Sequence, residues 1–100
     1  LMVLHAAYRI DHGLDFKSEV SMAKHFVANM LNRVIDRSIQ VHGALGYSTD
    51  TPLEHMYQHA RWARFADGAD EVHQMRIAQR TISAYRDHGT TRTATGDLPI

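Results

Sequence analysis

The sequence contains no cysteine. Disulfide bonds, thiolate nucleophiles and cysteine-ligated metal sites are therefore excluded. The absence is typical of a reducing compartment. We therefore expect a cytoplasmic location, or the mitochondrial matrix or a peroxisome if the source is eukaryotic.

An excess of charge of either sign is also missing, because eleven basic residues balance eleven acidic ones. Nucleic-acid binding needs a clustered positive field, so nucleic acid is not expected as the main partner. No apolar run approaches the roughly 20 residues that cross a bilayer, so no membrane span is expected.

The N-terminus shows no secretory signal, since residues 1–5 have neither a basic leader nor a small-residue cleavage site. The chain opens inside a helical pattern, and its 100 residues provide for one small domain. We therefore expect a piece of a longer protein.

The sequence is rich in helical periodicity and nearly devoid of strand patterns. We predict helices over residues 1–12, 18–42, 52–64 and 69–87, which form an all-α helical bundle. The bundle is expected to cover residues 1–88, as part of a larger C-terminal helical domain. Residues 89–100 are rich in threonine and are predicted to form a flexible tail.

Short signals mark the predicted helix ends. Gly13 is suited to stop the first helix in a left-handed conformation, and Ser18 and Glu19 suit the first turn of the second. Thr51 followed by Pro52 resembles an N-cap and a first helical residue, and Glu54 completes a possible capping box. The apolar stripes on residues 18–42 and 69–87 are wide, so a further partner surface is expected to cover them.

Residues 40–47 end the long helix in a glycine-rich turn. Glycines there can bring exposed backbone amides close to a ligand, and the Gln40 amide could recognise a nucleotide or a phosphate. The alternative is an ordinary helix C-cap and loop, which spacing alone favours.

Residues 65–73 hold three carboxylates around Gly68 at a helix start. A carboxylate on such a turn can serve as a base when apolar surroundings raise its pKa. The alternative is capping: Asp67 suits an N-cap, and Asp70 and Glu71 complement the helix dipole. On chemistry alone we favour capping.

Two further groups of residues are weaker candidates for a site. His55 and His59 have the i, i+4 spacing of two metal ligands, but no third ligand is evident and no metal site is predicted. Arg61 and Arg64 could clamp a phosphate or a carboxylate, although pairing with acids on a solvated face is favoured.

Five segments, in order and at the right spacings over roughly residues 4–86, resemble the C-terminal helical domain of the acyl-CoA dehydrogenase family. They are Ser21-Met22-Ala23-Lys24, residues 40–47, Asp50-Thr51-Pro52-Leu53, residues 57–61 and residues 66–72. The sequence looks like a branch of the family that carries Asp in place of the usual catalytic Glu.

The resemblance implies a flavin enzyme that makes an α,β-double bond in an acyl-CoA thioester by removing an α-proton and passing the β-hydride to FAD. It implies that Asp67 is the base and that Gly68 lies against the thioester. As first-turn residues, Asp70 and Glu71 should point to solvent or along the helix dipole, which leaves the base role to Asp67. The positions that match FAD contacts, the first five to the FAD of a neighbouring subunit, are Gln40, Val41, His42, Gly43, Ala44, Ala69, Asp70 and Glu71.

Four departures from the family pattern stand out. Asp67 is one methylene shorter than the usual Glu, and Ala44 replaces a glycine. Ala69 replaces a hydroxyl residue that bonds FAD, and Ala66 replaces a tyrosine.

The resemblance also implies partners: an acyl-CoA substrate, an electron-transfer flavoprotein or similar acceptor, and a homodimer or homotetramer. Residues 18–42 and 43–47 are expected at the subunit interface. The 100 residues alone are expected to be inactive, because most of the flavin pocket lies elsewhere. The alternative is a non-catalytic helical oligomerisation or interaction module derived from the same fold.

Overall fold

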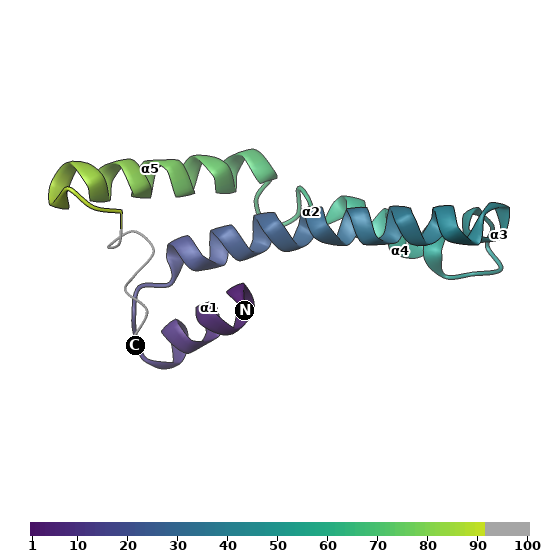
Figure 1. The fold of residues 1–100 in the computed structure, drawn as a ribbon, viewed down its shortest axis with the longest axis horizontal. Helices are drawn as coiled ribbons and strands as arrows, with labels where there is room; N and C mark the ends of the chain where they lie inside the picture. The colour runs from purple at the N-terminus through teal and green to yellow at the C-terminus, as the bar shows by residue number, and fades with distance from the viewer. Residues whose placement is uncertain (92–100) are drawn as a thin grey trace. The chain divides into compact units, whose positions relative to one another are not determined.

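The computed structural model describes residues 1–91 as five helices (Figure 1). They are α1 (Met2–Asp11), α2 (Lys17–His42), α3 (Ala44–Tyr47), α4 (Leu53–Trp62) and α5 (Asp70–His88). Residues 1–91 contain no strand, so the all-α prediction is confirmed. Most of the predicted tail, residues 92–100, lies outside the described residues.

The chain divides into two compact units. Among the described residues, unit 1 contains residues 1–24 and 71–91, and unit 2 contains residues 25–70. The long helix α2 therefore contributes its first turns to unit 1 and the remainder to unit 2.

Unit 1 is built around polar side chains as well as small apolar ones. Its buried residues include Ala6, Ala23 and Ala84, but also the charged residues Arg9 and Glu19. The Nε atom of Arg9 lies 3.5 Å from Oε1 of Glu19 and donates to the backbone carbonyl of Asp15 at 2.5 Å. This buried ion pair connects the last turn of α1 to the first turn of α2.

The predicted helix ends of unit 1 are largely confirmed. Gly13 follows α1 with a φ of +64°, the left-handed conformation expected of it. Ser18 lies in the first turn of α2, where it is buried and accepts a hydrogen bond from Arg80 Nε at 2.7 Å. Arg80 also forms an ion pair with Asp15.

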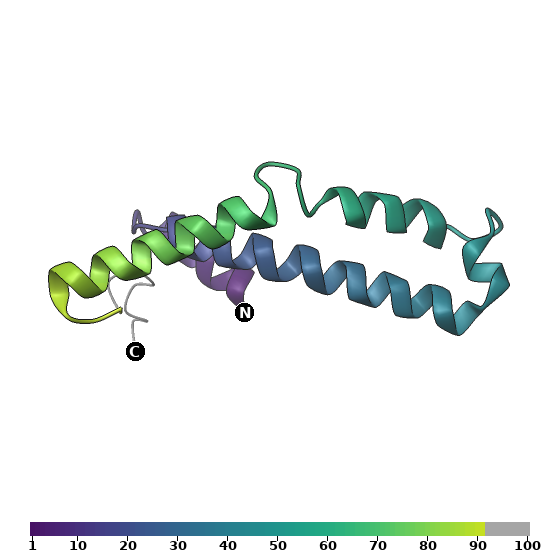
Figure 2. The same ribbon diagram turned by 90° about the horizontal axis from the view of Figure 1, so that it is seen from above.

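In unit 2, α4 lies beside the part of α2 that belongs to this unit (Figure 2). The two helices approach closely because the facing residues are small: Ala28 and Ala60 are 5% and 1% exposed. Asn32 Nδ2 donates to the carbonyls of both alanines, at 2.7 and 2.6 Å. One side-chain amide thus joins the two backbones.

The expected loop at residues 43–47 is in fact a short helix, α3, so that prediction was wrong. Gly46 explains how α3 folds against the end of α2. A Cβ at Gly46 would lie 2.8 Å from both Cβ of His42 and the carbonyl oxygen of Ile39. Gly46 is therefore required for packing within this chain.

The predicted capping box at the start of α4 was also wrong. The helix begins at Leu53 with Pro52 as N-cap, and no side chain caps it. The Glu54 carboxylate instead accepts a hydrogen bond from Gln58 Nε2, one turn further on, at 3.0 Å. Glu54 therefore bonds to a side chain on the helix surface and not to the backbone amide that a capping box requires.

Large apolar side chains remain exposed in both units. Among the described residues, the buried apolar core consists of five alanines and Ile35. Phe26, Val34, Trp62 and Phe65 of unit 2 each keep about half of their surface exposed. Residues 1–91 include no helix with the length and apolar character needed to cross a membrane.

Candidate functional site

The first predicted group, residues 40–44, forms an exposed turn at the end of α2. Gly43 has a φ of +63°, and its amide donates to the Gln40 carbonyl at 3.2 Å. A Cβ at Gly43 would meet no atom within 4 Å, so this glycine serves the backbone conformation and leaves open space beside it. Gln40, Val41, His42 and Ala44 are all exposed. A carboxamide beside open backbone can bind the polar edge of a nucleotide or a phosphate.

The second predicted group lies on the loop of residues 65–69 between α4 and α5. The amides of Phe65 and Ala66 both donate to the Trp62 carbonyl at 3.0 Å, which turns the chain away from α4. Asp67 then has a φ of +53° and Gly68 a φ of +103°. Aspartate is among the few residues with a side chain that adopt the left-handed region readily. Non-glycine residues in such conformations cluster at active sites, so the exposed Asp67 is a candidate functional group.

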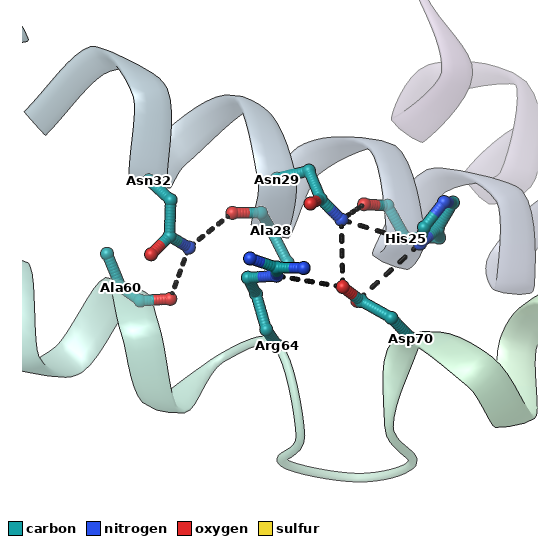
Figure 3. A network of polar contacts seen from close by, with 7 residues as sticks. All are labelled: His25, Ala28, Asn29, Asn32, Ala60, Arg64 and Asp70. Carbon is teal, nitrogen blue, oxygen red and sulfur yellow. Dashed lines mark hydrogen bonds and ion pairs between the residues drawn. The ribbon is translucent and has the colours of Figure 1, made fainter. Parts of the chain in front are cut away.

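Two bonds between Arg64 and Asp70 close this loop at its base. The Asp70 amide donates to the Arg64 carbonyl at 3.0 Å, and the Arg64 Nε donates to Asp70 Oδ2 at 2.8 Å. We call this double link the clasp. Figure 3 shows Arg64 and Asp70 at the two ends of the loop, which extends away from α2.

Two residues of α2 hold the clasp from the other side (Figure 3). Asn29 Nδ2 donates to Asp70 Oδ2 at 3.1 Å and to the His25 carbonyl at 2.9 Å. His25 Nδ1 lies 3.5 Å from Asp70 Oδ1. Asp70 is only 4% exposed, so the expectation that it points to solvent or along the helix is wrong. The reason is that a buried carboxylate needs partners, and α2 and Arg64 supply them.

Burial acts on the pKa of Asp70 in the direction of an increase, but hydrogen bonds from Arg64, Asn29 and His25 outweigh it. The net pKa lies below the ordinary value of 3.8. A depressed pKa means that the folded protein favours the charged form more than the unfolded chain does. The resulting stabilisation is present above about pH 4 and is lost as the pH falls through the lowered pKa.

We therefore predict that acid destabilises the native protein in part through Asp70. The melting temperature of the wild type should fall as the pH is lowered below about 4, and the fall should be shallower in Asp70→Asn. Thermal unfolding followed by circular dichroism across this range measures both slopes. Equal slopes would show that Asp70 does not contribute to acid sensitivity.

The two predicted groups do not meet in this chain. They lie at opposite ends of α4 (Figure 2), which at 1.5 Å per residue spans about 15 Å. Ala69 is half-buried beside the clasp, whereas Glu71 is exposed, as its place in the first turn predicts.

The remaining candidates have ordinary structural roles. The rings of His55 and His59 meet edge to face at 4.5 Å. Residues 1–91 contain no group of three side chains placed to hold a metal ion. Arg64 pairs with an acid, as favoured, although that acid is buried, and the guanidinium of Arg61 lies over the ring of Phe65 at 5.7 Å.

Comparison with known proteins places these features in a family. Residues 1–82 match the sequence model described as "Acyl-CoA dehydrogenase, C-terminal domain". The chain is 44% identical over 84 residues to acyl-CoA dehydrogenase family member 10 of Mus musculus, which covers 82% of the chain and 8% of that protein. It is 37% identical over 82 residues to 3-(aryl)acrylate reductase of Clostridium sporogenes (82% of the chain, 22% of the relative). It is also 35% identical over 89 residues to (R)-benzylsuccinyl-CoA dehydrogenase of Thauera aromatica (88% of the chain, 22% of the relative).

The chain thus spans less than a quarter of the length of each of these relatives. No solved structure matches it significantly.

Proposed function

The chain belongs to the acyl-CoA dehydrogenase family, and we propose that it forms the C-terminal helical part of a longer, FAD-dependent enzyme that introduces an α,β-double bond into an acyl-CoA thioester. The observation that carries this proposal is an exposed carboxylate, that of Asp67, on a loop of a chain of this family. The backbone of Asp67 has a left-handed conformation.

The proposed reaction moves one proton and one hydride. The Asp67 carboxylate takes the proton from the α-carbon, and the electron pair of that C–H bond becomes part of the new double bond. FAD, when bound, would supply the acceptor for the hydride that leaves the β-carbon. Gly68 comes directly after Asp67 and has no side chain, so a thioester can approach the backbone there. An electron-transfer flavoprotein or similar acceptor would then reoxidise the cofactor.

A substrate survey tests the proposal. The full-length protein that contains this chain is mixed without oxygen with acyl-CoA thioesters of short, medium, long and aryl-substituted chains. Bleaching of the flavin absorbance by at least one class is expected. A protein that keeps FAD but is bleached by none of them, and does not reduce the corresponding enoyl-CoA in the reverse direction, would be the non-catalytic helical module instead.

We propose that Gln40 and the backbone at Gly43 contact the FAD of a neighbouring subunit. This proposal is supported by the exposure of the turn and by its separation from Asp67 along α4. Homo-oligomerisation would also cover nearby apolar side chains that this chain leaves to solvent, since Val41 is 85% and Tyr47 80% exposed.

The Gln40→Ala variant should retain FAD less well than the wild type. Loss of one hydrogen-bonding amide is worth about 1 kcal/mol, which corresponds to roughly a fivefold weaker affinity. The flavin content of the full-length protein after exhaustive dialysis measures this retention. Gln79→Ala, which removes an exposed amide from α5, is the matched control and should keep its FAD. Equal retention in both variants would contradict the role of Gln40.

A further inference from the structure

We propose that Asp70 is a positioning residue: through the clasp, it fixes the place of the Asp67 carboxylate relative to the substrate. The inference rests on the proposed function, because it assumes that Asp67 is the base. It assigns to Asp70 a task inside the chain, in place of the FAD contact that the family resemblance implies.

The clasp restricts the loop from both ends. Arg64 and Asp70 are joined once through the backbone and once through side chains, so only five residues, 65–69, remain between the joined positions. A loop this short has few conformations when its ends are fixed. Asp67 is the middle residue of the five, so its carboxylate depends directly on how the ends are held.

The clasp is in turn attached to a rigid element. His25 and Asn29 are one turn apart on α2, and both side chains face Asp70 (Figure 3). The side chain of Asp70 is 6% exposed, so water competes little for these contacts. Groups supported by buried hydrogen bonds from a helix are placed more precisely than groups on an unsupported loop.

The backbone at Asp67 needs such support. Aspartate adopts the left-handed region more readily than most residues, but other conformations stay open to it unless the surrounding structure holds the backbone. The amides of Phe65 and Ala66 bond to the Trp62 carbonyl at the start of the loop, and the bonds between Arg64 and Asp70 join its two ends. Loss of the Asp70 charge would therefore weaken the side-chain part of the clasp and loosen the loop, while the Asp67 carboxylate stays in the chain.

The test compares Asp70→Asn with wild type in the full-length holoenzyme. Three quantities are measured: the rate constant of flavin reduction at saturating acyl-CoA, the Kd of acyl-CoA, and amide hydrogen exchange over residues 65–69. A displacement of about 1 Å can cost roughly 10²-fold in rate, so a 10- to 100-fold slower reduction is expected with acyl-CoA affinity and FAD content nearly unchanged. Exchange over residues 65–69 should become faster.

A matched control comes from the exposed pair Arg86 and Asp87 on α5, whose Nε and Oδ1 atoms lie 3.4 Å apart. Asp87→Asn makes the same chemical change without touching the loop and should leave all three quantities unchanged. If Asp70→Asn fails to fold, Arg64→Lys takes its place in the test, because lysine keeps the charge but lacks the planar fork of donors. Arg86→Lys is its control.

The outcomes separate the two proposals. A less stable Asp70→Asn or Arg64→Lys that reduces its flavin at the wild-type rate would overturn the positioning role. A wild type that is never reduced by acyl-CoA would overturn the proposed function instead. In that case hydrogen exchange still tests the clasp, since unchanged exchange over residues 65–69 in Asp70→Asn would show that Asp70 does not hold the loop.

Discussion

Replacement of Asp67 by asparagine should abolish flavin bleaching by acyl-CoA in the full-length protein while FAD remains bound. The amide cannot accept the α-proton, and positioned proton transfer of this kind contributes about 10²- to 10⁴-fold in rate. The α-proton of a thioester is weakly acidic, so little reaction should remain without the base. Stopped-flow measurement of flavin absorbance, together with the flavin content of the purified variant, gives both quantities.

Asp50→Asn is the control for this experiment. Asp50 is an exposed aspartate in a turn of the same unit, and its loss should leave the rate unchanged. A normal rate of reduction in Asp67→Asn would show that the base lies elsewhere and that the family correspondence at this position is wrong.

The second large effect is expected from Arg9, on stability rather than on catalysis. Arg9→Met should lower the free energy of local unfolding by about 3 kcal/mol or more. The Arg9 and Glu19 side chains are 9% and 4% exposed, so the variant leaves the Glu19 carboxylate buried without its cation. It also removes the hydrogen bond to the Asp15 carbonyl.

Native-state hydrogen exchange of the full-length protein measures this effect. The protected amides of α1 and of the first turns of α2 should exchange roughly 10²-fold faster in Arg9→Met, since about 1.4 kcal/mol corresponds to a factor of ten. Arg86→Met, which breaks an exposed pair, should change these rates little. The double variant Arg9→Met, Glu19→Met should recover part of the loss, because no uncompensated charge remains. Exchange in Arg9→Met within about threefold of wild type would show that the pair is not important for this unit.

The sequence was a good guide wherever local rules decide the structure. Four helices were predicted to within two residues of their ends, because apolar periodicity and glycines such as Gly13 act over short distances. The short helix α3 was missed. It depends on the fit of Gly46 against Ile39 and His42, which a loop-like composition conceals.

The candidate site was predicted in the same uneven way. The loop that carries Asp67 and Gly68 was found from its carboxylates and glycine, and from the family resemblance. Asn29 and His25 were not found, because their contacts to Asp70 join positions more than forty residues apart. The sequence does carry one sign of these contacts: His25 and Asn29 place polar side chains four residues apart within the apolar stripe of α2, and buried polar groups require partners.

The positive φ of Asp67 bears on why this chain carries aspartate where its family usually has glutamate. Short side chains such as those of aspartate and asparagine are accommodated at left-handed backbone positions far more readily than long ones. The identity of the acid is therefore coupled to the path of the main chain, and reach alone does not determine it. Replacement of Asp67 by glutamate without a change of the loop would therefore mismatch the acid and the backbone.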